Sequence, residues 1–315
     1  MTMRTFDRKK TREGWGDGLI DIGEQHGDVV VMVGDNAISC NVDRFAESWP
    51  DRFYEMGISE MHMVNAAAGM SLLGKVPFYV TYSAFGVGRV YDQLRVTVGY
   101  TPCNVKIGGA HSGLSVGPDG ATHQMMEDLA CMLALPNYTV LTPADYWETR
   151  KAVAAAHAIN GPVYIRFGRE SVPIVTTEAD PFEVGKARVL AEGEDATCIA
   201  IGTMVAEALL AHDKLAEDGI GLRVINMSTL KPLDTEVILG AARETKGIVT
   251  AEEHQLHGGL ASVVAQTVSR HAPVPMDYVA VEDRYGRSGD SEELLDLYGL
   301  RWWKIVEKVK GLLQL

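Results

Sequence analysis

The sequence has 315 residues, of which 46% are hydrophobic and 23% are charged, a composition typical of a globular protein with a large core. The formal net charge of −13 argues against a nucleic-acid or anionic-membrane partner. No apolar run approaches the roughly 18 residues of a membrane span, and the charged N-terminus lacks the apolar core of a signal peptide. The four cysteines are far apart without metal-ligand spacing, so we expect reduced thiols and a cytoplasmic location.

Strand-like and helix-like segments alternate through the first half of the chain. Strands are expected at 28–34, 76–82, 104–108, 138–141 and 162–167. Helices are expected between them, at 61–73, 90–98, 127–135 and 147–157. Strands separated by helices indicate βαβ units, in which a mostly parallel sheet is covered on both faces.

The pattern breaks at about 170–183, where two prolines and several acids show no periodicity. A second α/β series follows, with strands expected at 196–201, 222–226, 247–251 and 276–281, and helices at 205–217, 234–245, 259–269, 291–298 and 302–313. We therefore predict an α/β fold of two doubly wound domains, a mostly parallel-sheet domain followed by a smaller α/β domain. The predicted boundaries are 1–175 for the first domain, 176–190 for a linker and 191–315 for the second domain.

Two segments near strand ends contain candidate ligand-binding residues. Glu60 follows the turn residue Gly57 at the expected start of a helix, where an acid commonly caps the helix or interacts with its dipole. A partly buried glutamate there also suits a hydrogen bond to a ligand nitrogen. Tyr82 and Phe85 lie just past a strand end, where ligands bind in open α/β sheets. Their rings suit either stacking on a planar heterocycle or ordinary packing.

The glycine-rich segment 108–124, GGAHSGLSVGPDGATHQ, carries two histidines and an acid, His111, Asp119 and His123. This combination suggests proton handling or polar substrate binding, although each histidine alone also suits a structural role. A metal site is disfavoured because the spacing is not compact. Arg166 and Arg169 follow a strand end and suit contact with phosphate or carboxylate, or plain ion pairs.

The tripeptide Gly16-Asp17-Gly18 resembles the start of a GDG…N motif for magnesium and diphosphate. It stands in a charged, helix-like stretch rather than after a buried strand, and no asparagine follows at the usual spacing. We therefore predict neither a diphosphate site nor a metal ligand in this chain.

Taken together and in this order, these segments resemble the transketolase family over nearly the whole chain. MGISEMHMVNAAAG resembles the segment around the family's invariant glutamate, and GPDGATHQ resembles its Asp-Gly-x-Thr-His-Gln loop. GRSGDSEELLDLYGL resembles the signature of its C-terminal domain. The match is to the pyrimidine-binding and C-terminal domains, so the chain resembles the C-terminal section of a split, two-subunit transketolase.

The resemblance implies thiamine diphosphate as cofactor. Glu60 corresponds to the glutamate that hydrogen-bonds the aminopyrimidine ring and promotes its reactive tautomer. Tyr82 and Phe85 correspond to aromatics that pack on this ring, and Asp35 to an acid near the cofactor at the subunit boundary.

The resemblance also implies a substrate site for sugar phosphates. His111, Asp119 and His123 correspond to residues that contact the ketose hydroxyls, and Glu60, His123 and His111 are the catalytic candidates. Arg12, Ser39 and Arg169 correspond to phosphate contacts at the acceptor end, with Arg166 as the rival for the arginine role.

The implied activity is transfer of a two-carbon ketol unit, with pentose phosphates as the default substrates. A partner of the N-terminal-section type is expected to bind Mg²⁺ and the diphosphate, in an α₂β₂ heterotetramer. The alternatives are a 2-oxo-acid dehydrogenase β subunit, a 1-deoxyxylulose-5-phosphate synthase-like enzyme and a non-catalytic regulatory subunit. The intact loop and His111 argue against the dehydrogenase subunit. The synthase shares the loop but is usually one long chain, and His111 fits transketolase better. Retention of the site residues named above argues against a regulatory subunit. No catalytic role is assigned to Glu252, Glu253, His254 and His257, for which helix capping and interface polarity are favoured.

Overall fold

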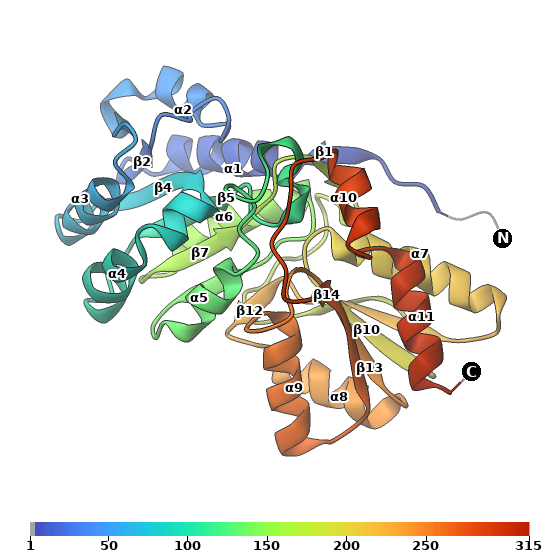
Figure 1. Ribbon diagram of the computed structural model, residues 1–315. Coiled ribbons are helices and arrows are strands. Elements are labelled where there is room, and N and C mark those ends of the chain that lie inside the picture. The colour runs from blue at the N-terminus through green and yellow to red at the C-terminus, as the bar shows by residue number, and fades with distance from the viewer. Residues whose placement is uncertain (1–3, 315) are drawn as a thin grey trace.

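A seven-stranded sheet forms the centre of the first domain in the computed structural model, which describes residues 4–314 (Figure 1). The strand order is β12-β6-β7-β5-β4-β2-β3, and all neighbours are parallel except the pair β12–β6. The strands are β2 (Val29–Val33), β3 (Phe53–Glu55), β4 (Val76–Tyr82), β5 (Lys106–Ala110), β6 (Thr139–Leu141), β7 (Val163–Arg166) and β12 (Thr229–Lys231).

Both faces of this sheet are covered because its central strands are apolar on both sides. In β2, Val31 and Val33 pack in one core and Met32 in the other. The first core is covered by α1 (Thr11–Gln25), α2 (Asp43–Ser48) and α6 (Tyr146–Ala158). The second is covered by α3 (Glu60–Leu72), α4 (Tyr91–Gln93), the π-helical turn η3 (Leu94–Tyr100) and α5 (Asp128–Ala134).

Helices α1 and α6 approach each other closely at glycines. A Cβ atom on Gly14 would lie 2.3 Å from the Tyr146 carbonyl oxygen, and one on Gly18 would lie 2.9 Å from the Arg150 carbonyl oxygen. Asp17 accepts hydrogen bonds from Tyr146 Oη and Arg44 Nη1. Gly16-Asp17-Gly18 therefore lies within helix α1, and Asp17 and Gly18 contact α6.

The second domain contains a five-stranded sheet of order β14-β13-β10-β11-β9, in which only β9 is antiparallel to its neighbour. Helices α7 and α11 cover one face, and α8 and α9 cover the other. The strands are β9 (Arg188–Ala191), β10 (Ala196–Ala200), β11 (Leu222–Asn226), β13 (Ile248–Gln255) and β14 (Met276–Val281). The helices are α7 (Met204–Glu217), α8 (Thr235–Glu244), α9 (Leu260–His271), α10 (Ser291–Leu297) and α11 (Trp302–Leu312).

The predicted fold class is confirmed, and each predicted strand or helix has a counterpart. The elements that were not predicted include β1 (Arg8–Lys10), α2, β3, β8 (Ser171–Pro173), β9, β12 and the short helices η1 (Pro50–Arg52), η2 (Ala84–Gly88) and η4 (Leu114–Asp119). Strands β1 and β8 pair with each other, so part of the irregular stretch after Arg169 is a small antiparallel sheet. The 3-residue strand β12 links the domains, because it follows β11 in the chain but pairs in the first sheet.

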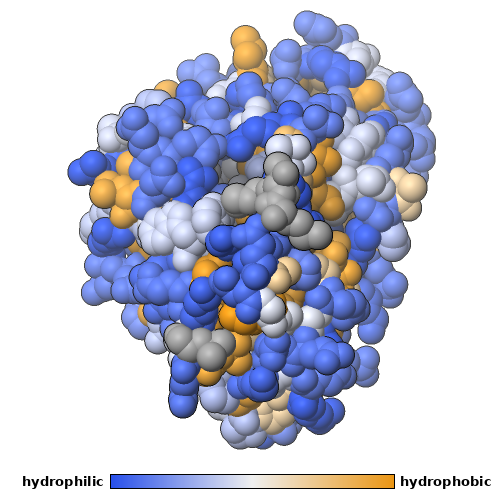
Figure 2. All heavy atoms as spheres, turned by 90° about the vertical axis from the view of Figure 1, so that its right-hand side faces the viewer, coloured by the Kyte–Doolittle hydropathy of each residue, from blue (hydrophilic) through white to orange (hydrophobic). Residues whose placement is uncertain are grey.

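The surface is uneven in polarity. The face that carries α7, α11 and the chain ends is mainly hydrophilic, with small scattered apolar patches (Figure 2). Large exposed apolar side chains are more frequent in the first domain, where they are Ile38, Tyr54, Ile58, Met61, Leu72, Leu73, Val96 and Tyr100. Three cysteines are buried and Cys131 is half-buried, all as free thiols. Among residues 4–314, none of the helices has the length and apolar character needed to cross a bilayer.

Candidate functional site

The predicted site residues gather at the carboxyl edge of the first sheet. Strands β2, β4 and β5 are parallel neighbours, so the segments that follow them meet at one edge. Asp35 and Ser39 follow β2, Tyr82 ends β4, and His111 follows β5. Three segments that are distant in sequence thus contribute to one place.

Four rings form an aromatic cluster there. Tyr82 and His111 stack with ring centroids 4.0 Å apart and an interplanar angle of 24°. Phe85 lies 6.2 Å from Tyr82, and His123 meets Phe85 edge-on at 5.2 Å. Tyr82, Phe85 and His123 are half-buried, so part of each ring is free to contact a planar ligand.

His111 is held as a neutral imidazole. Its side chain is fully buried, and burial together with Arg12, Arg169 and His123 lowers its pKa to about 3. Its Nε2 lies 3.4 Å from Ser39 Oγ, whereas its buried Nδ1 has no hydrogen-bond partner within residues 4–314. A buried polar atom of this kind is stabilised when a ligand group pairs with it. The backbone at His111 has a φ of 53°, in the left-handed region.

The glycine-rich loop that carries His123 is fixed by the second domain. Gln124 Nε2 donates to the carbonyls of Leu114 and, at 3.0 Å, Arg287, and Ser291 Oγ donates to the Ser115 carbonyl at 2.7 Å. Close packing against Ser288 and Ser291 leaves no room for a Cβ at Gly120 or Gly117, which both have a φ of 77°. The segment 286–300, matched above to the C-terminal signature, therefore positions this loop.

Glu60 is the first residue of α3, and its side chain is only 3% exposed. It does not cap the helix; its Oε2 accepts a hydrogen bond from Arg89 Nη1 at 2.7 Å. The Arg89 guanidinium also lies 4.5 Å from the Phe85 ring centroid. Sequence reasoning missed Arg89, because no local pattern marks an ion pair between residues 29 positions apart.

An open hollow of about 810 Å³ lies between the start of α1 and the segment after β2. It is lined by predicted residues from three segments, Arg12, Asp35, Ser39 and Tyr82, together with Asn36 and Glu55, which were not predicted. Arg12 Nη1 donates to the Ser39 carbonyl at 2.7 Å, and Ser39 Oγ shares a hydrogen bond of 2.8 Å with Tyr82 Oη. These contacts connect the hollow to the aromatic cluster.

The two candidate arginines have different surroundings. Arg169 Nη1 donates to Asp119 Oδ1 at 3.1 Å, and both side chains are partly exposed beside the glycine-rich loop. Arg166 is buried, and it donates to Asp128 Oδ2 at 2.9 Å and to the Glu253 carbonyl at 2.8 Å. Arg166 thus joins the two domains, whereas Arg169 is accessible to a ligand.

The residues at this sheet edge suit the aminopyrimidine end of thiamine diphosphate. A buried carboxylate, an aromatic wall and a neutral imidazole with an unpaired nitrogen lie together, as an aminopyrimidine and a polyhydroxylated substrate require. The buried Asn36 Oδ1 and Arg12 Nε are likewise without hydrogen-bond partners among the described residues.

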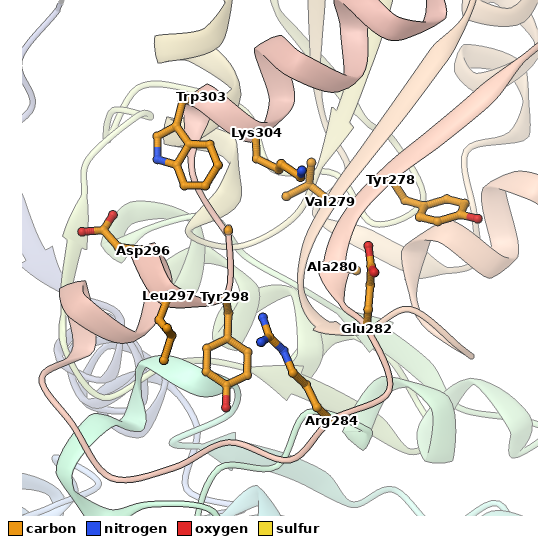
Figure 3. Close-up of a pocket in the computed structure, with 11 residues that line it drawn as sticks. Tyr278, Val279, Ala280, Glu282, Arg284, Asp296, Leu297, Tyr298, Trp303 and Lys304 are labelled. Carbon is orange, nitrogen blue, oxygen red and sulfur yellow. The ribbon is translucent and has the colours of Figure 1, made fainter.

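The second domain has a separate hollow of about 430 Å³ between β14, α10 and α11 (Figure 3). Its lining includes Tyr278, Glu282, Arg284, Tyr298 and Trp303, none of which was predicted as a site residue. The Arg284 guanidinium lies 3.9 Å from the Tyr298 ring centroid, so its cationic face is already covered. This hollow lies apart from the aromatic cluster.

Three buried polar residues of the second domain, Glu252, Glu253 and His254, form hydrogen bonds with backbone groups. The partners belong to α9, the glycine-rich loop and Gln255, in keeping with capping and interface roles.

Comparisons with known proteins agree with this architecture. Residues 7–175 match the pyrimidine binding domain of transketolase, and residues 185–305 match the transketolase C-terminal domain. A putative transketolase C-terminal section from Methanocaldococcus jannaschii is 38% identical over 96% of this chain and 95% of its own length. The 6-deoxy-6-sulfo-D-fructose transketolase subunit SqwH from Clostridium sp. is 38% identical over 94% of this chain and 92% of its own length. A solved structure described as a split gene transketolase, an inactive β4 tetramer, superposes with a TM-score of 0.91 at 42% identity, covering 97% of this chain and 99% of that one.

The chain therefore belongs to the transketolase family. Within that family, it has the domain content of the C-terminal section of a split transketolase, with the pyrimidine-binding domain first and the C-terminal domain second.

Proposed function

We propose that this chain is one subunit of a thiamine-diphosphate-dependent transketolase that transfers a two-carbon ketol unit from a ketose phosphate to an aldose. The observation that carries the proposal is the grouping of Glu60, Tyr82, Phe85, His111 and His123 at one sheet edge. Thiamine diphosphate, when bound, supplies the carbon that makes the donor's C2–C3 bond cleavable.

Glu60 and the two aromatic residues form the proposed cofactor wall. The buried Glu60 carboxylate would hydrogen-bond the aminopyrimidine ring, while Tyr82 and Phe85 pack on its face. Arg89 already pairs with Glu60, so binding requires Arg89 to share or leave that carboxylate. Asp35, exposed at the rim of the hollow, would lie near the cofactor at the subunit boundary.

The histidines and the polar loop form the proposed substrate wall. In the transfer, the donor's C2–C3 bond breaks, a new bond forms to the acceptor's aldehyde carbon, and a proton moves from the donor's C3 hydroxyl to the acceptor oxygen. His123, partly exposed with Nδ1 2.8 Å from Thr122 Oγ1, would carry that proton. The neutral His111 would orient a hydroxyl through its unpaired Nδ1, beside Asp119.

Arg12, Arg169 and Ser39 would bind the anionic end of the sugar. Guanidinium groups suit phosphate because they donate several hydrogen bonds in a fixed plane. Arg12 and Ser39 line the open hollow, and Arg169 lies beside Asp119. Arg166 is the weaker candidate, since its guanidinium already donates hydrogen bonds to Asp128 and to the Glu253 carbonyl. The hollow would also accept a sulfonate-terminated ketose such as that named for the clostridial relative.

The partner would be an N-terminal-section subunit that holds Mg²⁺ and the diphosphate, in an α₂β₂ heterotetramer. Exposed apolar side chains of the first domain support an extensive subunit interface, because solvent-exposed side chains of this size favour burial. They include Ile58, Met61, Leu72 and Leu73, which lie on or beside α3, the helix that begins with Glu60. A cytoplasmic location remains a prediction.

Reconstitution tests this function. The chain and the candidate N-terminal-section protein are assayed separately and mixed, with thiamine diphosphate, Mg²⁺ and panels of ketose-phosphate donors and aldose acceptors. We expect ketol transfer in the mixture only, reduced about 10²–10⁴-fold by Glu60→Gln with an unchanged circular dichroism spectrum. Near-normal turnover of Glu60→Gln would refute the assignment. Turnover of pyruvate instead of ketose phosphates would favour a 2-oxo-acid dehydrogenase or deoxyxylulose-phosphate synthase activity.

A further inference from the structure

Three potential metal ligands meet at the end of the first sheet opposite the aromatic cluster. His26 follows the last residue of α1, Asp28 precedes β2, and His157 lies in the last turn of α6. Among residues 4–314, these three side chains form the only group of three or more His, Cys, Asp or Glu whose ligand atoms lie within 4.8 Å of one another. Asp28 and Asp35 lie seven positions apart at opposite ends of strand β2, so the group lies roughly 20 Å from the candidate active site.

The geometry of the group suits a chelate. The two imidazole rings have centroids 4.0 Å apart, and His157 Nε2 lies 3.8 Å from Asp28 Oδ1. Tetrahedral zinc with bonds of about 2.1 Å holds its ligand atoms about 3.4 Å apart. Binding would require the stacked rings to turn apart, and there is freedom for this because His26 and Asp28 lie on a short turn through Gly27 and the Asp28 carboxylate is half exposed.

The electrostatics also suit a metal ligand set. His157 Nε2 is buried and has no hydrogen-bond partner among the described residues, so an ion there would satisfy a polar atom that now lacks a contact. Lys106 is a nearby cation that opposes the binding of a metal ion, but its Nζ donates to three oxygens, which partly offset its charge.

We propose that His26, Asp28 and His157 bind one divalent transition-metal ion of the Zn²⁺ class, with water as the remaining ligand. Imidazole nitrogens favour zinc, cobalt and nickel, whereas magnesium prefers oxygen ligands. The site is therefore distinct from the magnesium site proposed for the partner subunit. Because His26 ends α1, Asp28 precedes β2 and His157 lies in α6, the ion would link two of the three helices that cover one face of the sheet.

The test is Zn²⁺ titration of the untagged full-length chain by isothermal calorimetry, with Co²⁺ absorption as a second readout. We expect one ion per chain, no competition from excess Mg²⁺, and a Tm raised by about 5 °C at saturating Zn²⁺. His26→Ala and His157→Ala should each weaken Zn²⁺ binding by more than the about 10–100-fold that losing an outer-shell partner costs. Asp28→Asn, a nearly isosteric change that removes the carboxylate charge of a direct ligand, should weaken it by at least about 10–100-fold.

The exposed His271 of α9 provides the matched control, and His271→Ala should leave Zn²⁺ affinity unchanged. The proposal is overturned if the parent chain shows no saturable Zn²⁺ binding, or if Asp28→Asn and both histidine variants bind as the parent does. Circular dichroism without metal identifies a variant that has failed to fold, and Asp28→Asn then decides the question. Ketol transfer by the reconstituted enzyme should be unaffected by His157→Ala, so this test is separate from that of the proposed function.

Discussion

Arg89 Nη1 donates to Glu60 Oε2 at 2.7 Å while its guanidinium lies over the Phe85 ring. One arginine thus covers both the buried carboxylate and one aromatic ring of the proposed cofactor wall. Glu60 is only 3% exposed, whereas Arg89 is 41% exposed, so the arginine can leave into solvent and the carboxylate cannot. We infer that Arg89 neutralises Glu60 until a ligand replaces it.

Replacing Arg89 by Met should lower the free energy of unfolding by about 1 kcal/mol, because solvent screens the exposed arginine. In a Glu60→Gln background the same substitution should cost less, since no charge is left unpaired. Urea denaturation of the four chains in this double-mutant cycle measures the coupling. Arg95→Met, at an exposed position of η3, is the control and should change little. Equal effects of Arg89→Met in both backgrounds would contradict the pairing.

Asp128→Ala should destabilise the chain more strongly than Arg89→Met. It leaves Arg166 buried between the domains without its carboxylate, and breaking a buried ion pair costs about 3–5 kcal/mol. Glu292→Ala removes a half-exposed carboxylate that pairs with Arg8 and Arg301, and it should cost about 1 kcal/mol or less because solvent reaches the carboxylate and Arg301 keeps its other acidic partners. Urea denaturation compares the two variants. A cost for Asp128→Ala no larger than for Glu292→Ala would show that the buried pair is not needed for stability.

Acid should destabilise the chain partly through His111. Its pKa is about 3 in the folded chain and about 6.5 when unfolded, so below pH 6.5 the unfolded state binds a proton that the folded state excludes. The stability present above pH 6.5 therefore falls with pH, by up to about 1.4 kcal/mol per pH unit for this group. His111→Gln should make this fall shallower between pH 6.5 and the acid transition, whereas His271→Gln should not. Identical pH slopes for parent and His111→Gln would be inconsistent with a buried neutral imidazole.

The contact between α1 and α6 predicts a contrast between two glycines. Gly14→Ala places a methyl group 2.3 Å from the Tyr146 carbonyl oxygen and should cost about 1–3 kcal/mol. Gly311→Ala meets no neighbouring atom within 4 Å near the end of α11 and should stabilise by about 0.5 kcal/mol. Thermal unfolding of both variants gives the comparison, and a stabilising Gly14→Ala would mean that the helices are further apart than described.

The sequence was most informative where local pattern and tertiary structure agree. Runs such as VVVMV at β2 are apolar on both faces, so their burial in a parallel sheet could be predicted. The strands RKK, SVP and TLK could not, because each is short or polar and becomes a strand only through its partner.

In the candidate site, too, the residues that a local sequence pattern marks could be predicted and the others could not. Tyr82, His111 and Asp35 follow strand ends, and the topology of parallel sheets predicts that they meet. Arg89, Asn36 and the cluster around His157 were missed, because their partners lie on segments with no local sequence signal. The assignment of Arg12, Ser39 and Arg169 to substrate phosphate came from the family resemblance, and it remains a prediction.

Strand β12 has a consequence for how the chain matures. It hydrogen-bonds β6 at the edge of the first sheet, pairing Thr229 with Leu141 and Lys231 with Val140. During synthesis β6 leaves the ribosome well before β12, so the nascent first domain carries an open strand edge until part of the second domain has been translated. Open edges template pairing between chains, and incomplete domains aggregate readily. Residues 229–231 therefore cover the β6 edge only after they have been translated. The first domain thus depends on the second both for this edge protection and for the position of its glycine-rich loop.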